Sequence, residues 1–506
     1  MKGRYLIVMN ICFMMLAGIQ CRQAEELSSN GESKITVLYP GDEYFLNPFG
    51  GSAADHLVFL PLFVHDENGE LQPKLAERWE HSPDYRIWTI HIRRDIKWHD
   101  GAPVTAHDVK FSMELWAHPD VGMSTHGETI TVLDDFTFKV GYKKPSRNIL
   151  DAWQVFYPKH LLENLDSKEV QNWEFWTHPV GNGPYRYVRH VPKTMMVFEV
   201  DSDYPLGKPR IERVVIKFGG SSELTELLSG NVDAVAYIEI MDILKLKGDP
   251  RFTVYHMIYP QLLIAIHWNH RHPFFCDPVV RRALTLAINR RELYEVLNIP
   301  ETVPVFDVTF SERQFRRGEL PEPLPFNRKL ASHLLEEAGW QDSDADGIRE
   351  KDGEEFRFSM LVSDRTLMDE KPAVYIQEQL RRVGVRMEIT SFDFLLLHHR
   401  YITDEFDAAI YIFNNFPGLT WHYSSIGYDN PRIAYLHKSA GITMDLDKLD
   451  NIYLELMAIH KEDIPLTFLY PNVYGFIARK FIRGLSTPFH ADPILSIEHL
   501  WIEDKD

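Results

Sequence analysis

The fold class of this chain follows from a junction between a helix and a strand, Ile376-Gln377-Glu378-Gln379-Leu380-Arg381-Arg382-Val383-Gly384-Val385-Arg386-Met387-Glu388-Ile389. Its apolar residues Ile376, Leu380 and Val383 recur at helical spacing, so they share one face of a helix. Gly384 is the residue type that commonly ends a helix, and an apolar strand over 385–389 follows it directly. A helix closed by glycine that leads straight into a strand is typical of α/β proteins.

The same succession occurs earlier in the chain. A helix carrying Leu224, Leu227 and Leu228 on one face ends at Gly230, and a strand is predicted over Val232–Tyr237. Further strands are predicted where apolar residues alternate, over Arg86–Ile92, 138–142 and 214–218. Helix–strand alternation in two separate places predicts α/β lobes rather than a β-sandwich or a helical bundle.

The best-specified helices of the sequence lie between Asp277 and Leu293. Asp277 is a good N-cap and Pro278 a good first helical residue, and an apolar stripe follows to residue 288. Asn289 is predicted to cap a second helix, with Glu292 three residues further on to complete a capping box.

Composition indicates a folded protein of several domains. The 506 residues are 44% hydrophobic and 25% charged, which excludes a disordered or collagen-like chain and suits two to four domains. The formal net charge of −19 argues against a nucleic-acid partner, because a phosphate backbone requires clustered Lys and Arg. Three cysteines cannot form a disulfide framework.

The N-terminus predicts export. Lys2 and Arg4 precede an apolar run over 5–19, which is shorter than the roughly 20 residues that cross a bilayer and therefore indicates a signal peptide over 1–20. Leu16-Ala17-Gly18-Ile19-Gln20-Cys21 resembles a bacterial lipoprotein cleavage box, although Gln20 stands where a small residue is usual. We therefore expect lipidation at Cys21 and a tether over 21–32; the alternative is an ordinary cleaved signal beside an unmodified Cys21.

Two clusters have the composition of metal sites. Asp342, Asp344, Asp346 and Gly347 match the opening of a calcium loop, with Asp352 as the closing acid, although Gly353 occupies the usual closing position. This stretch predicts either a structural calcium site or a plain acidic turn. His267, His270 and His272 form the densest histidine cluster, but no acid accompanies them. The sequence contains none of the common hydrolase, Walker or C-x-x-C motifs.

Several segments together resemble the extracellular solute-binding proteins of family 5, the oligopeptide- and dipeptide-binding components of bacterial ABC importers. The residues 96–109, Ile-Lys-Trp-His-Asp-Gly-Ala-Pro-Val-Thr-Ala-His-Asp-Val, are similar to one signature of this family. Gly181-Asn182-Gly183-Pro184-Tyr185 is similar to its G-T-G-P-Y turn, 228–234 to its L-x-x-G-x-x-D segment, and the Asp277–Leu293 helices to a third signature. The matches follow the expected order from about residue 34 to the C-terminus.

The resemblance implies a two-lobed periplasmic-binding-protein fold of type II with an extra α/β domain. Lobe I would comprise 33–55, 177–269 and 479–506, the extra domain 56–176, and lobe II 270–478. Ligand would be enclosed between the lobes, and closure would present a shape that the membrane permease recognises. The implied protein is a monomer and not an enzyme.

The predicted ligand-binding residues are amides and aromatics near the expected lobe boundary. They are Tyr44, Trp268, Asn269, Asn414, Asn415, Phe416 and Trp421. In peptide-binding relatives the loop corresponding to Tyr411–Trp421 carries an Asp that pairs with the free amine of the peptide, whereas this chain has Asn414 and Asn415. We therefore expect poor binding of free-amine peptides, unless Asp407 or Glu43 supplies the acid.

The sequence thus predicts the solute-binding component of an ABC transporter, exported and held to a membrane by a lipid anchor. Its ligand would be a small molecule or short peptide, and its partners the permease subunits. The alternatives are a carrier of metal chelates or oligosaccharides with the same fold and, less favoured, an exported metal-dependent hydrolase that would use the histidine cluster.

Overall fold

The structure is a computed structural model of the chain. It describes residues 33–39, 55–65, 71–118, 129–146, 149–150, 155–219, 222–238, 240–246, 248–301, 303–307, 310, 314, 318–364, 370–414, 421–443, 445–485 and 497–503. The predicted signal and tether, Cys21, Glu43, Tyr44, Asn415 and Phe416 lie outside the described residues.

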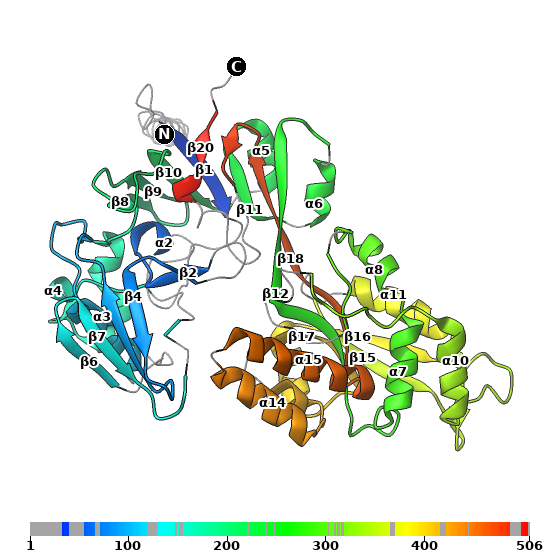
Figure 1. The fold of residues 1–506 in the computed structure, drawn as a ribbon. Coiled ribbons are helices and arrows are strands. Elements are labelled where there is room, and N and C mark those ends of the chain that lie inside the picture. Colours follow the sequence, from blue (N-terminus) through cyan, green and yellow to red (C-terminus); the bar gives the residue numbers. More distant parts are fainter. Residues whose placement is uncertain are drawn as a thin grey trace, which may run out of the picture.

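One mixed sheet of ten strands runs through both lobes. Its order is β16 (Arg386–Phe392), β15 (Arg357–Ser363), β17 (Ala408–Asn414), β12 (Phe252–Trp268), β18 (Leu466–Arg479), β11 (Ala234–Ile238), β1 (Lys34–Tyr39), β10 (Arg213–Phe218), β9 (Met195–Val200) and β8 (Tyr185–Val191). The long central strands β12 and β18 are antiparallel and connect the two lobes (Figure 1).

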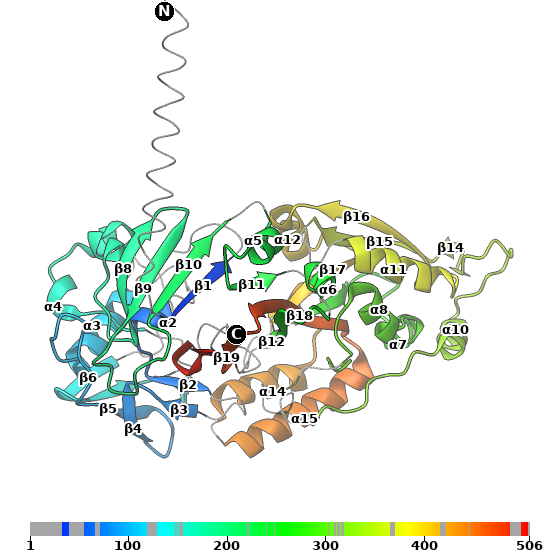
Figure 2. The same ribbon diagram turned by 90° about the horizontal axis from the view of Figure 1, so that it is seen from above.

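Lobe II surrounds the β16–β15–β17 end of the sheet with helices. They are α7 (Pro278–Ala287), α8 (Arg290–Leu297), α10 (Arg328–Glu337), α11 (Glu370–Arg381), α12 (Phe394–Ile402), α13 (Trp421–Ser425), α14 (Pro431–Ile442) and α15 (Leu446–Asp463). A small hairpin of β13 (Glu350–Lys351) and β14 (Glu354–Glu355) follows α10. Helices α14 and α15 lie on the side toward the extra domain, and α7 and α10 lie on the opposite side (Figures 1 and 2).

The predicted helix starts and stops of lobe II are confirmed. The carboxylate of Asp277 accepts the N–H of Val279 at 2.8 Å, and the amide oxygen of Asn289 accepts the N–H of Glu292 at 3.2 Å. These bonds satisfy N–H groups that have no partner inside a helix. Gly384 has φ +79°, the left-handed conformation that ends a helix without a side-chain clash.

Lobe I contains the other end of the sheet. Helices α5 (Glu223–Ser229) and α6 (Ile240–Lys245) and the short pair β19 (Ile482–Arg483) and β20 (Trp501–Ile502) complete it. One face of its sheet packs in a small core with α5 and α6, which includes Leu38, Leu227, Val235 and Ile477.

The extra domain is built on an antiparallel four-stranded sheet. The order is β4 (Ala76–His81), β5 (Ile87–Ile92), β7 (Thr137–Gly141) and β6 (Thr129–Asp134), accompanied by α3 (Ala106–Ala117) and α4 (Lys159–Leu162). The remaining elements are α2 (Asp55–Val58), β2 (Phe63–His65), β3 (Leu71–Pro73) and the 3₁₀ turns Ser167–Asn172 and Glu174–Thr177. Its core is continuous with the second face of the lobe I sheet, so the two units share one hydrophobic cluster.

Two of the family-like signatures meet where the extra domain joins lobe I. The N–H of Gly181 donates to Nδ1 of His99 at 3.2 Å, and Nε2 of His99 lies 3.0 Å from the carbonyl oxygen of Gly183. A Cβ on Gly181 would lie 1.9 Å from the carbonyl oxygen of Val58, so only glycine fits there. Burial of the His99 imidazole lowers its pKa, which keeps the ring neutral for this bonding pattern.

The predicted α/β class with two lobes and an extra domain is confirmed. The structure differs from the prediction in where the chain crosses between the lobes. The β12–β18 ladder shifts register between Tyr259 and Leu263, and this break separates the lobe I part of each strand from the lobe II part. The crossing therefore lies about ten residues before the predicted boundary at 269/270, because β12 continues through lobe II as a central strand. In β18 the crossing is near Pro471, which is again earlier than the predicted boundary at 478/479.

Candidate ligand-binding site

The parallel strands of both lobes end at the crossing. In lobe I, Ile238 at the carboxyl end of β11 pairs with Gly475, which follows the crossing in β18. In lobe II, Asn414 at the carboxyl end of β17 pairs with Leu262, which follows the crossing in β12. Ligands of open α/β sheets bind outside the carboxyl ends of the strands, so the two lobes direct their binding edges at one region.

A row of four tyrosines lies on the lobe I side of this region. Neighbouring strands β12, β18, β11 and β1 each contribute one ring, and the successive ring centroids are 5.9, 5.4 and 6.0 Å apart. The members are Tyr259, Tyr474, Tyr237 and Tyr39. The first three are half-buried and Tyr39 is buried. Three of the four rings are therefore partly exposed at the edge of the core. We call these four residues the tyrosine row.

Tyr237 reaches the row through an irregularity of the backbone. Simple alternation would place it on the face of Val235, but β11 has one extra residue between Val235 and Ile238 relative to β18. Tyr237 takes up this bulge with φ +54°, a conformation that costs a non-glycine residue about 1–3 kcal/mol. As a result its ring lies beside Tyr39 and Tyr474, and the Tyr259 hydroxyl donates to the Tyr237 hydroxyl at 3.3 Å.

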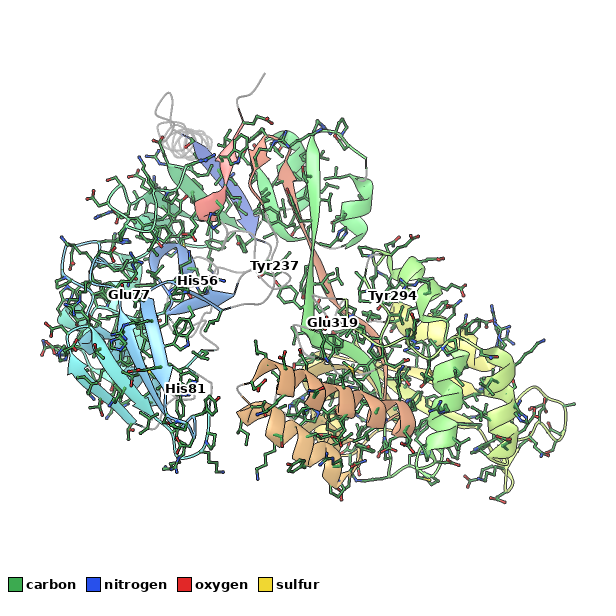
Figure 3. The ribbon with its side chains drawn as sticks, in the orientation of Figure 1. His56, Glu77, His81, Tyr237, Tyr294 and Glu319 are labelled. Carbon is green, nitrogen blue, oxygen red and sulfur yellow. The ribbon has the colours of Figure 1, made fainter. Side chains whose placement is uncertain are left out.

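The tyrosine row was not predicted from the sequence. The sequence contained one signal for it: Tyr39 and Tyr237 lie at the carboxyl ends of strands, where ligands of α/β proteins bind. Their alignment across four strands depends on long-range register, which periodicity does not contain. Figure 3 shows Tyr237 beside the crossing strands, between the two lobes.

On the lobe II side, the predicted residue Asn414 lies at the binding edge. Its backbone N–H donates to Nε2 of His422 at 3.1 Å. Burial lowers the pKa of His422 to about 3, so the imidazole is neutral and Nε2 can accept the bond. The predicted residue Trp421 is half-buried and lies against His422 with ring centroids 3.6 Å apart.

Two other predicted residues are not at this edge. Trp268 is fully buried and its indole N–H donates to Thr467 Oγ1 at 2.9 Å. The side chain of Asn269 is buried and donates to Asp404 and to the carbonyl of Phe406 at 2.9 and 2.8 Å. Trp268 is the last residue of β12 and Asn269 follows it, so both lie at the far end of the strand, about 20 Å from Leu262 at about 3.3 Å per residue. Both residues are therefore away from the crossing, which occurs earlier in the strand than the sequence predicted.

Asp407 also lies at this far end. Its Oδ2 accepts the N–H of Ser359 at 2.9 Å, and its Oδ1 lies 3.6 Å from Nε2 of His272. It precedes β17, whereas Asn414 ends this strand. Asp407 therefore has partners of its own and is separated from the binding edge by the length of β17.

The histidine cluster does not converge on one point. His267 is fully buried and bonds to the Tyr401 hydroxyl at 2.8 Å, whereas Nε2 of His270 lies 3.0 Å from the carbonyl oxygen of Pro465. With His272 beside Asp407, the three imidazoles have three different partners. The metal-dependent interpretation of this cluster loses its support.

The acidic turn after α10 brings four carboxylates together. Asp342, Asp344, Asp346 and Glu350 each offer an oxygen, and these atoms all lie within 4.8 Å of one another. The predicted fourth acid, Asp352, is not part of this group. It has φ +55° and occupies the β13–β14 turn with Gly353, whereas Glu350 on β13 remains beside the acidic turn.

Comparison with known proteins identifies the class. Residues 70–431 match the model of the bacterial extracellular solute-binding proteins, family 5. The chain belongs to this family, and it is therefore a solute-binding protein rather than a member of an enzyme family. The oligopeptide-binding protein AppA of Bacillus subtilis is 27% identical over 460 residues, which cover 83% of this chain and 81% of that protein.

Solved structures share the fold. A putative peptide-binding protein AppA from Clostridium difficile superposes with a TM-score of 0.78 at 21% identity, covering 93% of this chain and 100% of the other. NikZ from Campylobacter jejuni in complex with Ni(L-His) gives a TM-score of 0.72 at 23% identity, with 92% and 99% covered. Within the described part of the chain, no helix combines the length and the apolar character that a membrane span requires.

Proposed function

We propose that this protein captures a peptide or peptide-like solute between its lobes and delivers it to the permease of an ABC importer. The observation that carries the proposal is the convergence of both sets of parallel strands on the crossing, with aromatic rings on one side and Asn414 on the other. The similarity to an oligopeptide-binding protein over most of both chains supports a peptide ligand. A metal chelate is the second candidate, and the similar fold of the nickel–histidine-binding NikZ favours it.

We further propose that the site prefers ligands without a free amine. Asn414 and Asn415 are neutral, and the acid Asp407 lies at the other end of β17. A buried ammonium without a counter-charge costs several kcal/mol, so free-amine peptides lose more affinity than N-blocked ones.

The test is calorimetry on ligand-free protein with a set of tripeptides and their N-acetylated counterparts. We expect tighter binding of the acetylated set. Micromolar binding of the free-amine peptides that is lost on acetylation would overturn the amine argument. Mass spectrometry of small molecules released from the purified protein distinguishes a peptide from a metal chelate.

Export and anchoring at Cys21 form the remaining part of the proposal. The apolar segment over 5–19 and the cleavage box before Cys21 support them. Cys21→Ser should release the protein from the membrane fraction. An intact mass of the wild-type mature protein without a lipid adduct would contradict lipidation and leave export intact.

A further inference from the structure

We propose that the tyrosine row, together with Asn472, is the subsite for an aromatic side chain of the bound peptide. This inference rests on the proposed function and specifies the substrate class of the same site. Its starting point is that the row lies where the carboxyl ends of β1 and β11 meet the crossing.

The geometry of the row suits a flat apolar group. Ring contacts join Tyr259 to Tyr474 and Tyr474 to Tyr237 at interplanar angles of 79° and 74°, so the row presents alternating faces and edges. Aromatic pairs prefer such edge-to-face arrangements, and a ligand ring can extend the series by one member. The tyrosine hydroxyls give the row an uncharged polar edge. The lobe II side is also uncharged, since it carries the neutral amide of Asn414.

Asn472 supplies a polar group beside the row. It lies two residues before Tyr474 in β18 and therefore on the same face of the strand, and it pairs with Tyr259 of β12. The residue is 4% exposed, and its Oδ1 has no hydrogen-bond partner among the described residues. A buried amide oxygen without a partner is costly, and a donor on the ligand would satisfy it.

The backbone of Tyr237 is consistent with a functional role for its ring. The bulge in β11 and the positive φ place the ring on the face of the row, whereas an unstrained strand would have directed it to the opposite face. Strained residues and bulges of this kind occur preferentially at binding sites, where they re-aim a side chain. The left-handed backbone conformation is unfavourable for tyrosine, so the packing of its ring must offset the strain.

The experiment measures binding of N-acetylated tripeptide amides Ala-Xaa-Ala, with Tyr, Phe, Leu or Lys as Xaa, by calorimetry. Wild-type protein should bind the Tyr and Phe peptides about tenfold more tightly than the Leu peptide. Tyr474→Leu should remove this preference. Tyr237→Asn provides a second variant, because Asn tolerates the left-handed backbone and removes the ring.

Asn472→Leu separates the amide from the rings. It should weaken binding of the Tyr peptide several-fold and leave the affinity for the Phe peptide unchanged, because only tyrosine offers a hydroxyl donor to the Asn472 oxygen. Tyr435→Leu is the matched control, since Tyr435 is 57% exposed on α14 of lobe II and should leave all four affinities unchanged. Thermal melting of each variant shows whether the fold is retained.

The possible outcomes are distinguishable. Equal affinities of the wild type for the Tyr, Phe and Leu peptides would overturn the aromatic subsite and leave peptide binding in place. An aromatic preference that survives both Tyr474→Leu and Tyr237→Asn in folded protein would move the subsite away from the row. Absence of binding to every peptide would overturn the proposed function, and the subsite with it.

Discussion

Arg290 and Asp307 form an ion pair in the interior of lobe II. Both side chains are 3% exposed, and the Asp307 carboxylate also accepts the N–H of Leu324. The Arg290 guanidinium donates further to the carbonyls of Phe306 and Leu324 at 3.1 and 2.8 Å. The pair therefore links the segment after α8 to the first residue of this helix. The Arg290 charge and the Asp307 charge compensate each other.

Removal of one partner should be strongly destabilising. We predict that Asp307→Ala lowers the free energy of unfolding by about 3–5 kcal/mol, because the Arg290 charge stays buried without its partner. Glu455→Ala is the control, since the Arg432–Glu455 pair is 52% and 42% exposed and screened by solvent, so its loss should cost far less stability. Urea unfolding measures both changes, and equal losses in the two variants would contradict the prediction.

At the scale of single elements, the acidic turn between α10 and β13 is held in shape by hydrogen bonds from its own backbone to its carboxylates. The N–H of Gly347 donates to Asp342 Oδ2 at 3.1 Å, and the N–H of Ile348 donates to Asp346 Oδ1 at 2.8 Å. Hard cations such as calcium are bound by oxygen ligands in turns of this composition. Structural calcium remains a prediction for this turn, with Glu350 in place of Asp352.

Calcium should raise the melting temperature of the chelator-treated protein. At a free concentration of about 100 times Kd the gain is about 2.7 kcal/mol for a site that exists only in the folded state. Asp346→Asn should abolish the shift, whereas Asp352→Asn should retain it, because Asp352 lies in the β13–β14 turn. If EDTA-treated and calcium-saturated wild-type proteins melt at the same temperature, the turn has no bound cation.

At the scale of the whole molecule, lobe II contains a group of buried neutral histidines. His422, His437 and His460 are at most 2% exposed, and burial lowers their pKa values to about 3, 4 and 3. The Tyr423 hydroxyl joins two of them, at 2.7 Å from Nε2 of His460 and 3.3 Å from Nε2 of His437. These imidazoles are neutral in the folded protein and titrate near pH 6.5 when the chain unfolds.

The stability of the protein should therefore fall on acidification. Below about pH 6.5 the unfolded chain binds protons that the folded lobe excludes, so each buried histidine removes up to about 1.4 kcal/mol of stability per pH unit. Stability is fully present above pH 7 and declines between about pH 6.5 and 4. Urea unfolding at half-unit pH steps measures the slope.

A histidine variant identifies the source of the slope. His437→Gln should make the decline shallower, whereas His333→Gln should leave it unchanged, because the side chain of His333 is 63% exposed. A constant unfolding free energy between pH 7 and 5 would contradict this account. The carboxylates with low pKa values, such as Glu378, contribute only at lower pH, because they remain ionised in this range.

The sequence by itself determined the local elements of this protein. Asp277 and Asn289 begin α7 and α8, and Gly384 ends the turn after α11, because caps and positive-φ positions depend on residues a few places apart. The family-like signatures also lie in local segments, so the two-lobed class was predictable. Among the described residues that were predicted to bind ligand, Asn414 lies at the carboxyl end of β17, and its role in binding stays a prediction.

Tertiary structure alone decided where the lobes meet and which side chains assemble there. The sequence of β12 is nearly continuous in its apolar pattern, so the crossing near Tyr259 is visible only as a shift of register against β18. The tyrosine row likewise depends on the pairing of four strands from distant parts of the chain and on one extra residue in β11. Local propensity does not specify such long-range register, and a single bulge reverses the face of a side chain.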